Sequence, residues 1–173
     1  MAICLPNNLA DIYNIRGNLY SYLGNYEKAV ANYNKYLELS SNSNAYYNLG
    51  ITQYFLNMLD EATNNLECCI QSDLDNKFAY YHLAVINYAL NQKEKVSQYF
   101  DTATRLEKLE DNPLYAEDEH GYYARGLAKY QIGNNIEGAF KDIKKAKEIA
   151  TKHQYIEFVE KAGSLLSEIE AKK

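Results

Sequence analysis

Small residues recur along the chain at a near-constant interval, and each follows a tyrosine by four positions. The small residues are Gly17, Gly50, Ala84 and Gly126, and the tyrosines are Tyr13, Tyr46, Tyr80 and Tyr122. The first two intervals fit a helical hairpin repeat of about 34 residues, whereas the third is longer and contains an insertion. Residues four apart lie on adjacent turns of one helical face. Each copy therefore predicts a helix on which the tyrosine ring lies next to the space left by the small residue. A second helix can approach closely at that space.

The second helix is predicted shortly after each small residue. It offers a small or medium side chain and, four positions later, a large one. The first set is Ala29, Ala62, Val96 and Ala139, and the second is Tyr33, Leu66, Phe100 and Ile143. The short segments between the two helices contain Gly24, Asn57, Asn91 and Asn134, and Gly and Asn tolerate the left-handed conformation that ends a helix. The sequence therefore predicts four helical hairpins.

One more helix is predicted over residues 153–171. Its apolar positions are Ile156, Val159, Ala162, Leu166 and Ile169, with charged residues between them. An array of stacked hairpins needs a terminal element that is polar outside. This helix is therefore interpreted as a cap.

Three segments carry a resemblance to a known family: GNYEKA at residues 24–29, YYNLG at 46–50 and YYARGLAKYQIG at 122–133. They resemble the tetratricopeptide repeat (TPR) family, over roughly residues 10–150. The resemblance implies an all-α, right-handed superhelical solenoid of about four hairpins plus a C-terminal capping helix, forming a single domain over 1–173. Repeats are expected at 10–42, 43–76, 77–110 and 119–152. Three departures from the family pattern are Ala84 in place of glycine, one extra residue before Ala139, and the lack, except at Pro113, of the proline that often ends each repeat.

Composition limits the partners of the chain. It has 18 tyrosines, no tryptophan and a net charge of −5, and its Lys and Arg residues are scattered. A dense basic patch of the kind that binds nucleic acid is missing, so nucleic acid is not an expected partner. No apolar run reaches the roughly 18 residues that span a bilayer, so membrane insertion is not expected either. The first eight residues lack the features of a secretion signal, which predicts a cytoplasmic protein.

Catalytic and metal-binding patterns are missing from the sequence. His82, His120 and His153 have no paired ligand spacing, and the three cysteines do not form a CxxC pair. Glycine-rich phosphate-binding motifs are not found. The acidic residues between Glu107 and Glu119 lack the order of a calcium loop and are interpreted as a solvated loop. We therefore expect a protein that is not an enzyme and has no cofactor or metal.

The resemblance implies which residues line the concave surface made by the first helices of the hairpins. They are mostly aromatic and amide side chains, without Lys or Arg. The predicted peptide-binding groove consists of Asn14, Asn18, Tyr22, Tyr47, Ile51, Tyr54, Phe55, Phe78, Tyr81, Tyr88, Tyr123 and Tyr130. Family members that grip a chaperone's C-terminal carboxylate use cations at such positions, whereas Phe78 and His82 stand there in this chain. A carboxylate clamp is therefore disfavoured.

These observations predict a scaffold or adaptor that binds a peptide or an amphipathic helix of a partner protein in an aromatic groove. Two alternatives stay open. One is a chaperone similar to those of type III secretion translocators, which typically carry three such repeats where four are predicted here. The other is a self-associating structural module, with the groove filled by its own C-terminal helix or by a second copy in a homodimer.

Overall fold

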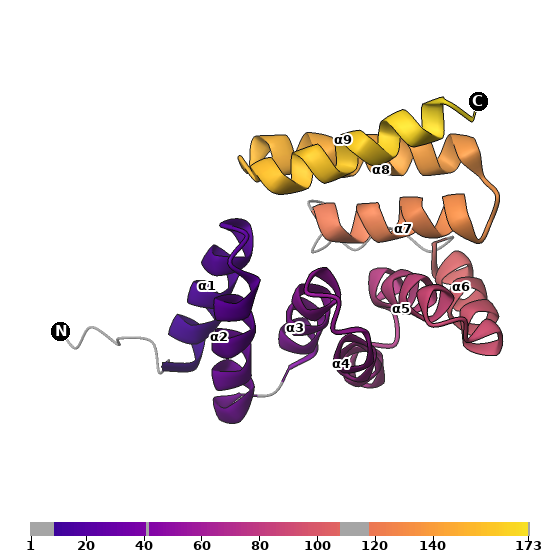
Figure 1. The fold of residues 1–173 in the computed structure, drawn as a ribbon. Coiled ribbons are helices and arrows are strands. Elements are labelled where there is room, and N and C mark those ends of the chain that lie inside the picture. Colours follow the sequence, from indigo (N-terminus) through magenta and orange to yellow (C-terminus); the bar gives the residue numbers. More distant parts are fainter. Residues whose placement is uncertain (1–8, 41, 108–117, 173) are drawn as a thin grey trace. The chain divides into compact units, whose positions relative to one another are not determined.

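The structure, a computed structural model, describes residues 9–40, 42–107 and 118–172 of the chain (Figure 1). These residues form nine helices and no strand, which confirms the prediction of an all-α fold of helical hairpins. The expected acidic positions 110, 111 and 117 lie outside the described residues.

The chain groups into two compact units, Met1–Leu74 and Asp75–Lys173. The first unit contains two hairpins, made by α1 (Leu9–Tyr22) with α2 (Tyr26–Leu39) and by α3 (Ser43–Phe55) with α4 (Leu59–Ser72). The second contains α5 (Lys77–Ala89) with α6 (Lys93–Leu106), α7 (Glu119–Gln131) with α8 (Ile136–Lys152), and the last helix α9 (Ile156–Glu170). The hairpins follow the predicted repeats closely, whereas the single domain over 1–173 stays a prediction.

The recurring glycines explain why the helices of a hairpin approach so closely. A Cβ atom on Gly17 would lie 2.7 Å from the Tyr33 ring, and one on Gly50 would lie 2.7 Å from Leu66 Cγ. On Gly126 it would lie 2.6 Å from Ile143 Cδ1. These distances are too short for real contacts, so the large side chain of the second helix occupies the space that the glycine leaves open. The predicted pairing of small and large residues is confirmed at these three hairpins.

Side chains of Asn and Asp set the starts of five helices. Each accepts a hydrogen bond from the backbone N–H three residues later, as N-caps do. These caps are Asn25, Asn42, Asn76, Asp118 and Asn135. The turns within the hairpins contain residues with positive φ, namely Gly24, Asn57, Asn91 and Asn134. The turn residues predicted from the sequence are therefore the ones that adopt the left-handed conformation.

In the second unit a network of charged side chains joins the third hairpin to the fourth. Arg125 of α7 donates two hydrogen bonds to Asp142 of α8, at 2.9 and 2.6 Å. Lys129 pairs with Asp142 at 2.9 Å and with Glu107, the residue that follows α6, at 2.7 Å. Tyr81 of α5 donates its hydroxyl to the other oxygen of Glu107 at 2.5 Å. The network is thus anchored on α5, α7, α8 and the end of α6.

The interpretation of the acidic stretch as a solvated loop is wrong for Glu107 and Glu119. Burial raises the pKa of Glu107, but the hydrogen bonds from Lys129 and Tyr81 outweigh it and hold that pKa below its usual range. Glu119 is buried, which raises its pKa. Glu107 directly follows α6 and Glu119 begins α7, and both carboxyl groups are directed toward the interior. Sequence spacing alone does not indicate this orientation.

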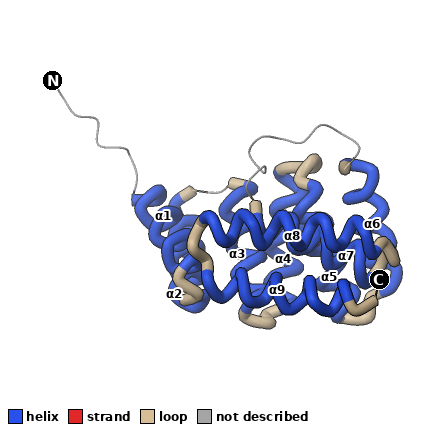
Figure 2. The backbone as a smooth tube through the Cα atoms, turned by 90° about the horizontal axis from the view of Figure 1, so that it is seen from above, coloured by secondary structure: helices blue, strands red, loops and turns tan. Residues whose placement is uncertain are grey.

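The last helix buries a different face from the one predicted. Its buried residues are Phe158, Ala162, Leu165 and Ile169, preceded by the buried cap residue Tyr155. Ile156, predicted to face the core, is 72% exposed. Helix α9 lies beside α8 in both views (Figures 1 and 2). Ala162 and Ile169 belong to both patterns, but Phe158 and Leu165 are buried where Val159 and Leu166 were predicted, so the prediction missed the face by about one residue.

Candidate functional site

In the first unit, three predicted groove residues lie four apart on one face of α1: Asn14, Asn18 and Tyr22. Asn48 of α3 donates its side-chain N–H to Asn18 Oδ1 at 3.4 Å, so this face of α1 is turned toward α3. The same oxygen accepts the Tyr33 hydroxyl at 2.8 Å. Asn18 is therefore held in place by the two helices next to its own.

Asn14 and Tyr22 flank this anchored position by one turn on each side. Asn14 Oδ1 is shielded from solvent and has no hydrogen-bond partner among the residues that the structure describes. Burying an acceptor without a hydrogen-bond donor costs free energy, so a hydrogen bond from an N–H group to this oxygen would be stabilising. Tyr22, at the other end, is 45% exposed. This face thus combines an unsatisfied amide oxygen with an accessible ring.

The predicted groove residues of α3 divide into two pairs. Tyr47 and Ile51 are buried, whereas Tyr54 and Phe55 keep part of their surface exposed. Phe55 stacks on Tyr26 of α2 with ring centres 5.5 Å apart, and Tyr54 meets Phe55 edge to face at 5.4 Å. Burial raises the pKa of Tyr54, so its hydroxyl stays neutral and able to donate.

In the second unit, α5 turns two of its predicted groove residues inward. Phe78 is buried with its ring 5.4 Å from that of Tyr122. Tyr81 is fully buried, with its ring edge to face against Phe100 at 6.1 Å and its hydroxyl bonded to Glu107. Tyr88 is different, because 49% of it is exposed.

Helix α9 contacts both predicted groove residues of α7. The Tyr123 ring meets Phe158 edge to face at 5.3 Å, and the Lys161 ammonium lies 5.5 Å from the centre of the same ring. The Tyr130 hydroxyl donates to Glu168 at 2.8 Å. The surface of the fourth hairpin that was predicted to face a ligand is thus partly covered by the chain's own last helix.

Across the twelve predicted residues, accessibility falls into three classes. Tyr22 and Tyr88 are exposed. Partly buried are Asn14, Asn18, Tyr54, Phe55 and Tyr130. Buried are Tyr47, Ile51, Phe78, Tyr81 and Tyr123. The structure brings Asn14, Asn18 and Tyr22 together with α3 in one unit, and the binding role of all twelve stays a prediction.

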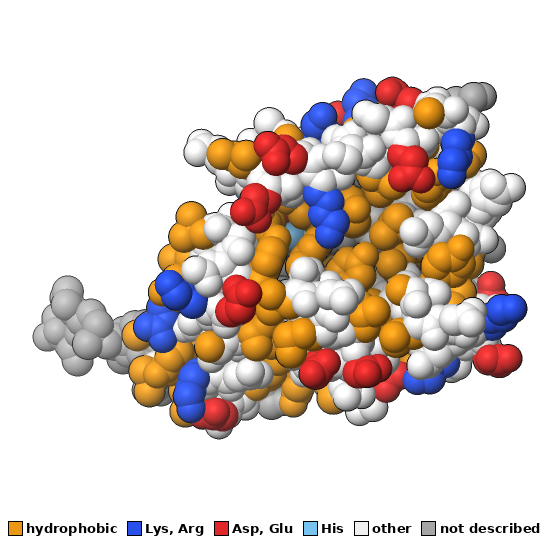
Figure 3. All heavy atoms as spheres, viewed as in Figure 1, with side chains coloured by type: hydrophobic (Ala, Val, Ile, Leu, Met, Phe, Trp, Pro, Cys, Tyr) orange, Lys and Arg blue, Asp and Glu red, His pale blue; other side chains and the backbone are white. Residues whose placement is uncertain are grey.

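The sequence reasoning missed a group of exposed apolar side chains on α1 and just after it. They are Leu9, Ile12, Ile15, Leu19 and Leu23, each between 56% and 76% exposed. Figure 3 shows hydrophobic side chains at the surface over α1 and α2, at the left edge of the view. The spacings of three and four residues between these apolar positions signal an apolar helix face, but apolar residues do not recur at the same positions in every repeat.

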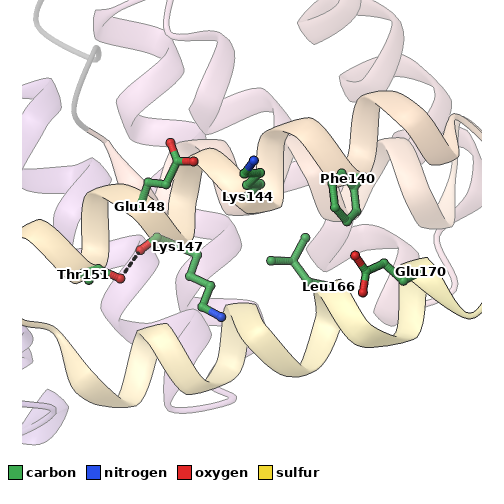
Figure 4. Close-up of a pocket in the computed structure, with 7 residues that line it drawn as sticks. All are labelled: Phe140, Lys144, Lys147, Glu148, Thr151, Leu166 and Glu170. Carbon is green, nitrogen blue, oxygen red and sulfur yellow. Dashed lines mark hydrogen bonds between the residues drawn. The ribbon is translucent and has the colours of Figure 1, made fainter.

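The outer side of α8 and α9 forms an open pocket of about 570 Å³. Figure 4 shows its lining, which combines apolar and charged side chains: Phe140, Lys144, Lys147, Glu148, Thr151, Leu166 and Glu170. The Thr151 hydroxyl donates to the backbone oxygen of Lys147 at 2.7 Å. The lining of this pocket thus carries charges of both signs.

Two histidines of the second unit have strongly lowered pKa values. Burial lowers the pKa of His82 to about 3, with a further contribution from the positive charge of Lys161. Burial also lowers the pKa of His120 to about 3, and the ring of His120 packs 4.8 Å from Phe158. Both are therefore neutral near pH 7 and contribute to packing. Within the described ranges, no three His, Cys, Asp or Glu residues are grouped so as to hold a metal ion.

None of the helices in the described part of the chain is both long enough and apolar enough to cross a membrane.

Comparison with known proteins supports the repeat architecture. The family model of the tetratricopeptide repeat matches residues 10–43. No curated protein matches the chain. Among solved structures, MamA is similar with 22% identity over 84% of this chain and 80% of its own, at a TM-score of 0.58.

Two further structures share this likeness. TTC0263, a thermophilic TPR protein of Thermus thermophilus, has 17% identity over 95% of this chain and 93% of its own, at a TM-score of 0.58. YrrB, described as a TPR protein with an unusual peptide-binding site, has 19% identity over 88% of this chain and 75% of its own, at 0.56. Such low identities concern the fold alone. The repeat model matches residues 10–43, and the hairpins that follow share the fold of solved TPR proteins, so these findings support the resemblance to the tetratricopeptide repeat family that the sequence motifs indicated.

Proposed function

We propose that this chain is a protein-interaction scaffold that binds an extended peptide segment of a partner protein on the face shared by α1 and α3. The observation that carries the proposal is the shielded Asn14 Oδ1, which has no donor among the described residues. The side chain of Asn14 is only partly buried, so it can turn this oxygen toward a peptide laid along α1, and a backbone N–H of the peptide then satisfies it.

The side chains around Asn14 suit such a ligand. Asn18 is fixed by Tyr33 and Asn48, so the face is preorganised and loses little freedom on binding. Tyr22 supplies accessible ring surface. The predicted groove residues on this face include no Lys or Arg, so we expect a ligand recognised by its backbone and apolar side chains rather than by a terminal carboxylate.

The second unit offers less surface for the same role. Its predicted groove residues Phe78, Tyr81 and Tyr123 are buried, and Tyr130 is bonded to Glu168 of α9. Tyr88 is the exception, since about half of it is exposed. We therefore place the principal binding face on the first unit. The similar structure of YrrB, a TPR protein with a peptide-binding site, supports peptide binding as a class of function for this fold.

The proposal is tested with a peptide selected from a phage-displayed library of random short peptides, using the full chain as bait. The selected peptide is synthesised with a fluorophore, and its Kd is measured by anisotropy. Asn14→Ala and Tyr22→Ala should each weaken binding by roughly tenfold, because each removes a contact of about 1.4 kcal/mol.

Two variants serve as matched controls. Asn34→Ala removes an exposed amide from α2, and Tyr88→Ala removes an exposed tyrosine from the second unit. Both should bind the peptide within about twofold of the unaltered chain. Equal Kd values for the unaltered chain, Asn14→Ala and Tyr22→Ala would exclude the α1 and α3 face as the binding site.

A further inference from the structure

A second face of α1 carries the largest run of exposed apolar side chains in the described part of the first unit. This outer stripe consists of Leu9, Ile12, Ile15, Leu19 and Tyr22, spaced by three or four residues. At about 100° per residue, Ile12 and Leu19 lie about a third of a turn from Asn14 and Asn18. The outer stripe is therefore distinct from the proposed peptide face, and Tyr22 lies at the border between the two.

Equivalent repeat positions in α3 show what this face does inside an array. Alignment of Gly17 with Gly50 places Ile12 at Ala45, Leu19 at Thr52 and Tyr22 at Phe55. Ala45 and Thr52 are buried, and Phe55 stacks on Tyr26 of the preceding helix α2. The outer stripe is thus the face that an inner hairpin turns toward the helices before it.

The residue types on α1 differ from those at these inner positions. The equivalents of Ile12, Ile15 and Leu19 in α7 are Gly121, Ala124 and Ala128, all buried. A Cβ on Gly121 would lie 2.5 Å from the Phe78 ring, so these positions of α7 are small where α5 comes close. On α1 the equivalent positions hold large branched side chains, and α5 also has one at Ile86, the fully buried equivalent of Leu19, so large side chains at this face can pack against a neighbouring helix.

Four residues of the outer stripe, Leu9, Ile12, Leu19 and Tyr22, are spaced symmetrically about a point between positions 15 and 16. When α1 is laid antiparallel on a copy of itself about a two-fold axis near positions 15 and 16, Leu9 meets Tyr22 and Ile12 meets Leu19. A closed two-fold interface requires such a self-complementary surface. Arg16, near the axis, does not obstruct it, because its guanidinium bonds Asn32 of α2 and lies 5.0 Å from the Tyr13 ring.

From this pattern we infer that the outer stripe of α1 is the interface of a symmetric homodimer, in which α1 packs antiparallel against α1 of a second copy. The helix has 14 residues, so the contact is smaller than the roughly 800 Å² per partner of a standard stable interface. The dimer is therefore weak, and its population rises with protein concentration.

Sedimentation equilibrium of the full chain over a wide range of concentration tests this inference. The average mass should rise from the 19.9 kDa of one chain toward twice that value. The double variant Ile12→Lys/Leu19→Lys should associate at least about tenfold more weakly, because it places unpaired charges in the interface. Ile156→Lys changes an equally exposed isoleucine of the second unit and should behave as the unaltered chain.

The register is tested separately by mixing the Ile12→Cys and Leu19→Cys variants under mild oxidation. The mixed disulfide between the two variants should form faster than either homodisulfide, and the unaltered chain measures the background from its own cysteines. A constant mass of one chain at all concentrations overturns the inference, as does undiminished association of the Lys double variant. If deletion of residues 1–8 turns a monomeric chain into a dimer, the stripe is covered within one chain and the inference is also wrong.

Discussion

The rings of Tyr123 and Phe158 meet edge to face, with their centres 5.3 Å apart. Tyr123 belongs to α7 and was predicted to face a ligand, whereas Phe158 comes from the last helix. Phe158 is almost completely buried. The terminal helix therefore packs against the first helix of the fourth hairpin as well as against the second.

Phe158→Ala should destabilise the protein by about 3–5 kcal/mol, because it removes a buried ring from contact with Tyr123, His120 and Tyr155. Ile156→Ala in the same helix should cost far less, since that side chain is mostly exposed. Urea denaturation followed by circular dichroism measures both. If Ile156→Ala were the more damaging of the two, the face assigned to α9 would be wrong.

Gly50→Ala should destabilise the protein by about 1–3 kcal/mol, although alanine favours helices, because the added methyl group would lie 2.7 Å from Leu66 Cγ. Gly163→Ala is the matched control in α9. Its nearest neighbour is the flexible end of Lys147 at 3.3 Å, so helix propensity should prevail and stabilise the protein by up to about 1 kcal/mol. Thermal unfolding should thus shift in opposite directions for the two variants, and shifts of the same sign would contradict the packing argument.

Asp142→Ala should destabilise the protein by about 3–5 kcal/mol, because it leaves the buried charge of Arg125 without its bidentate partner. Lys35→Ala breaks the exposed pair of Lys35 and Glu38 and should leave the unfolding temperature nearly unchanged. Differential scanning calorimetry compares the two. A negligible effect of Asp142→Ala would mean that the network joining α7 and α8 contributes little to stability.

Stability should fall as the pH drops from about 6.5 toward 3, the pKa of buried His82. In this window the histidine is protonated in the unfolded state but neutral in the folded state, so lowering the pH favours unfolding. Between about pH 7.5 and pH 5, His82 alone should account for a loss of about 2 kcal/mol. His120 and Lys161 lie close enough to influence this titration.

The His82→Leu variant isolates the contribution of His82. Its free energy of unfolding, measured by urea at both pH values, should change by about 2 kcal/mol less than that of the unaltered chain. This comparison stays valid when the variant is less stable at both pH values. An identical pH dependence of the two proteins would show that His82 is not responsible.

The fold could be predicted from the sequence because its constraints are local and repeated. Gly50 and Leu66 must meet within one hairpin, and Asn57 must end one helix and let the next begin. Such signals lie close together in the sequence and recur in register. The capping helix could be located, but which of its residues are buried was predicted incorrectly. This helix occurs only once, so no second copy was available for comparison to determine its buried face.

The candidate site was less predictable because burial depends on contacts between hairpins. Tyr22 and Tyr81 are both tyrosines on first helices, yet one is half exposed and the other is bonded to Glu107 inside the third hairpin. The partners of Tyr123 and Tyr130 come from α9, which is separated from them in the sequence by the whole of α8. Spacing within one helix carries no information about such neighbours.

The most direct measurement is a nuclear magnetic resonance titration of the isotope-labelled full chain with the peptide selected by phage display. The proposal predicts that the largest changes in chemical shift occur at Asn14, Tyr22 and Tyr54, including the side-chain amide of Asn14. Saturable binding with its largest changes in α8 and α9, and none in α1 or α3, would contradict it.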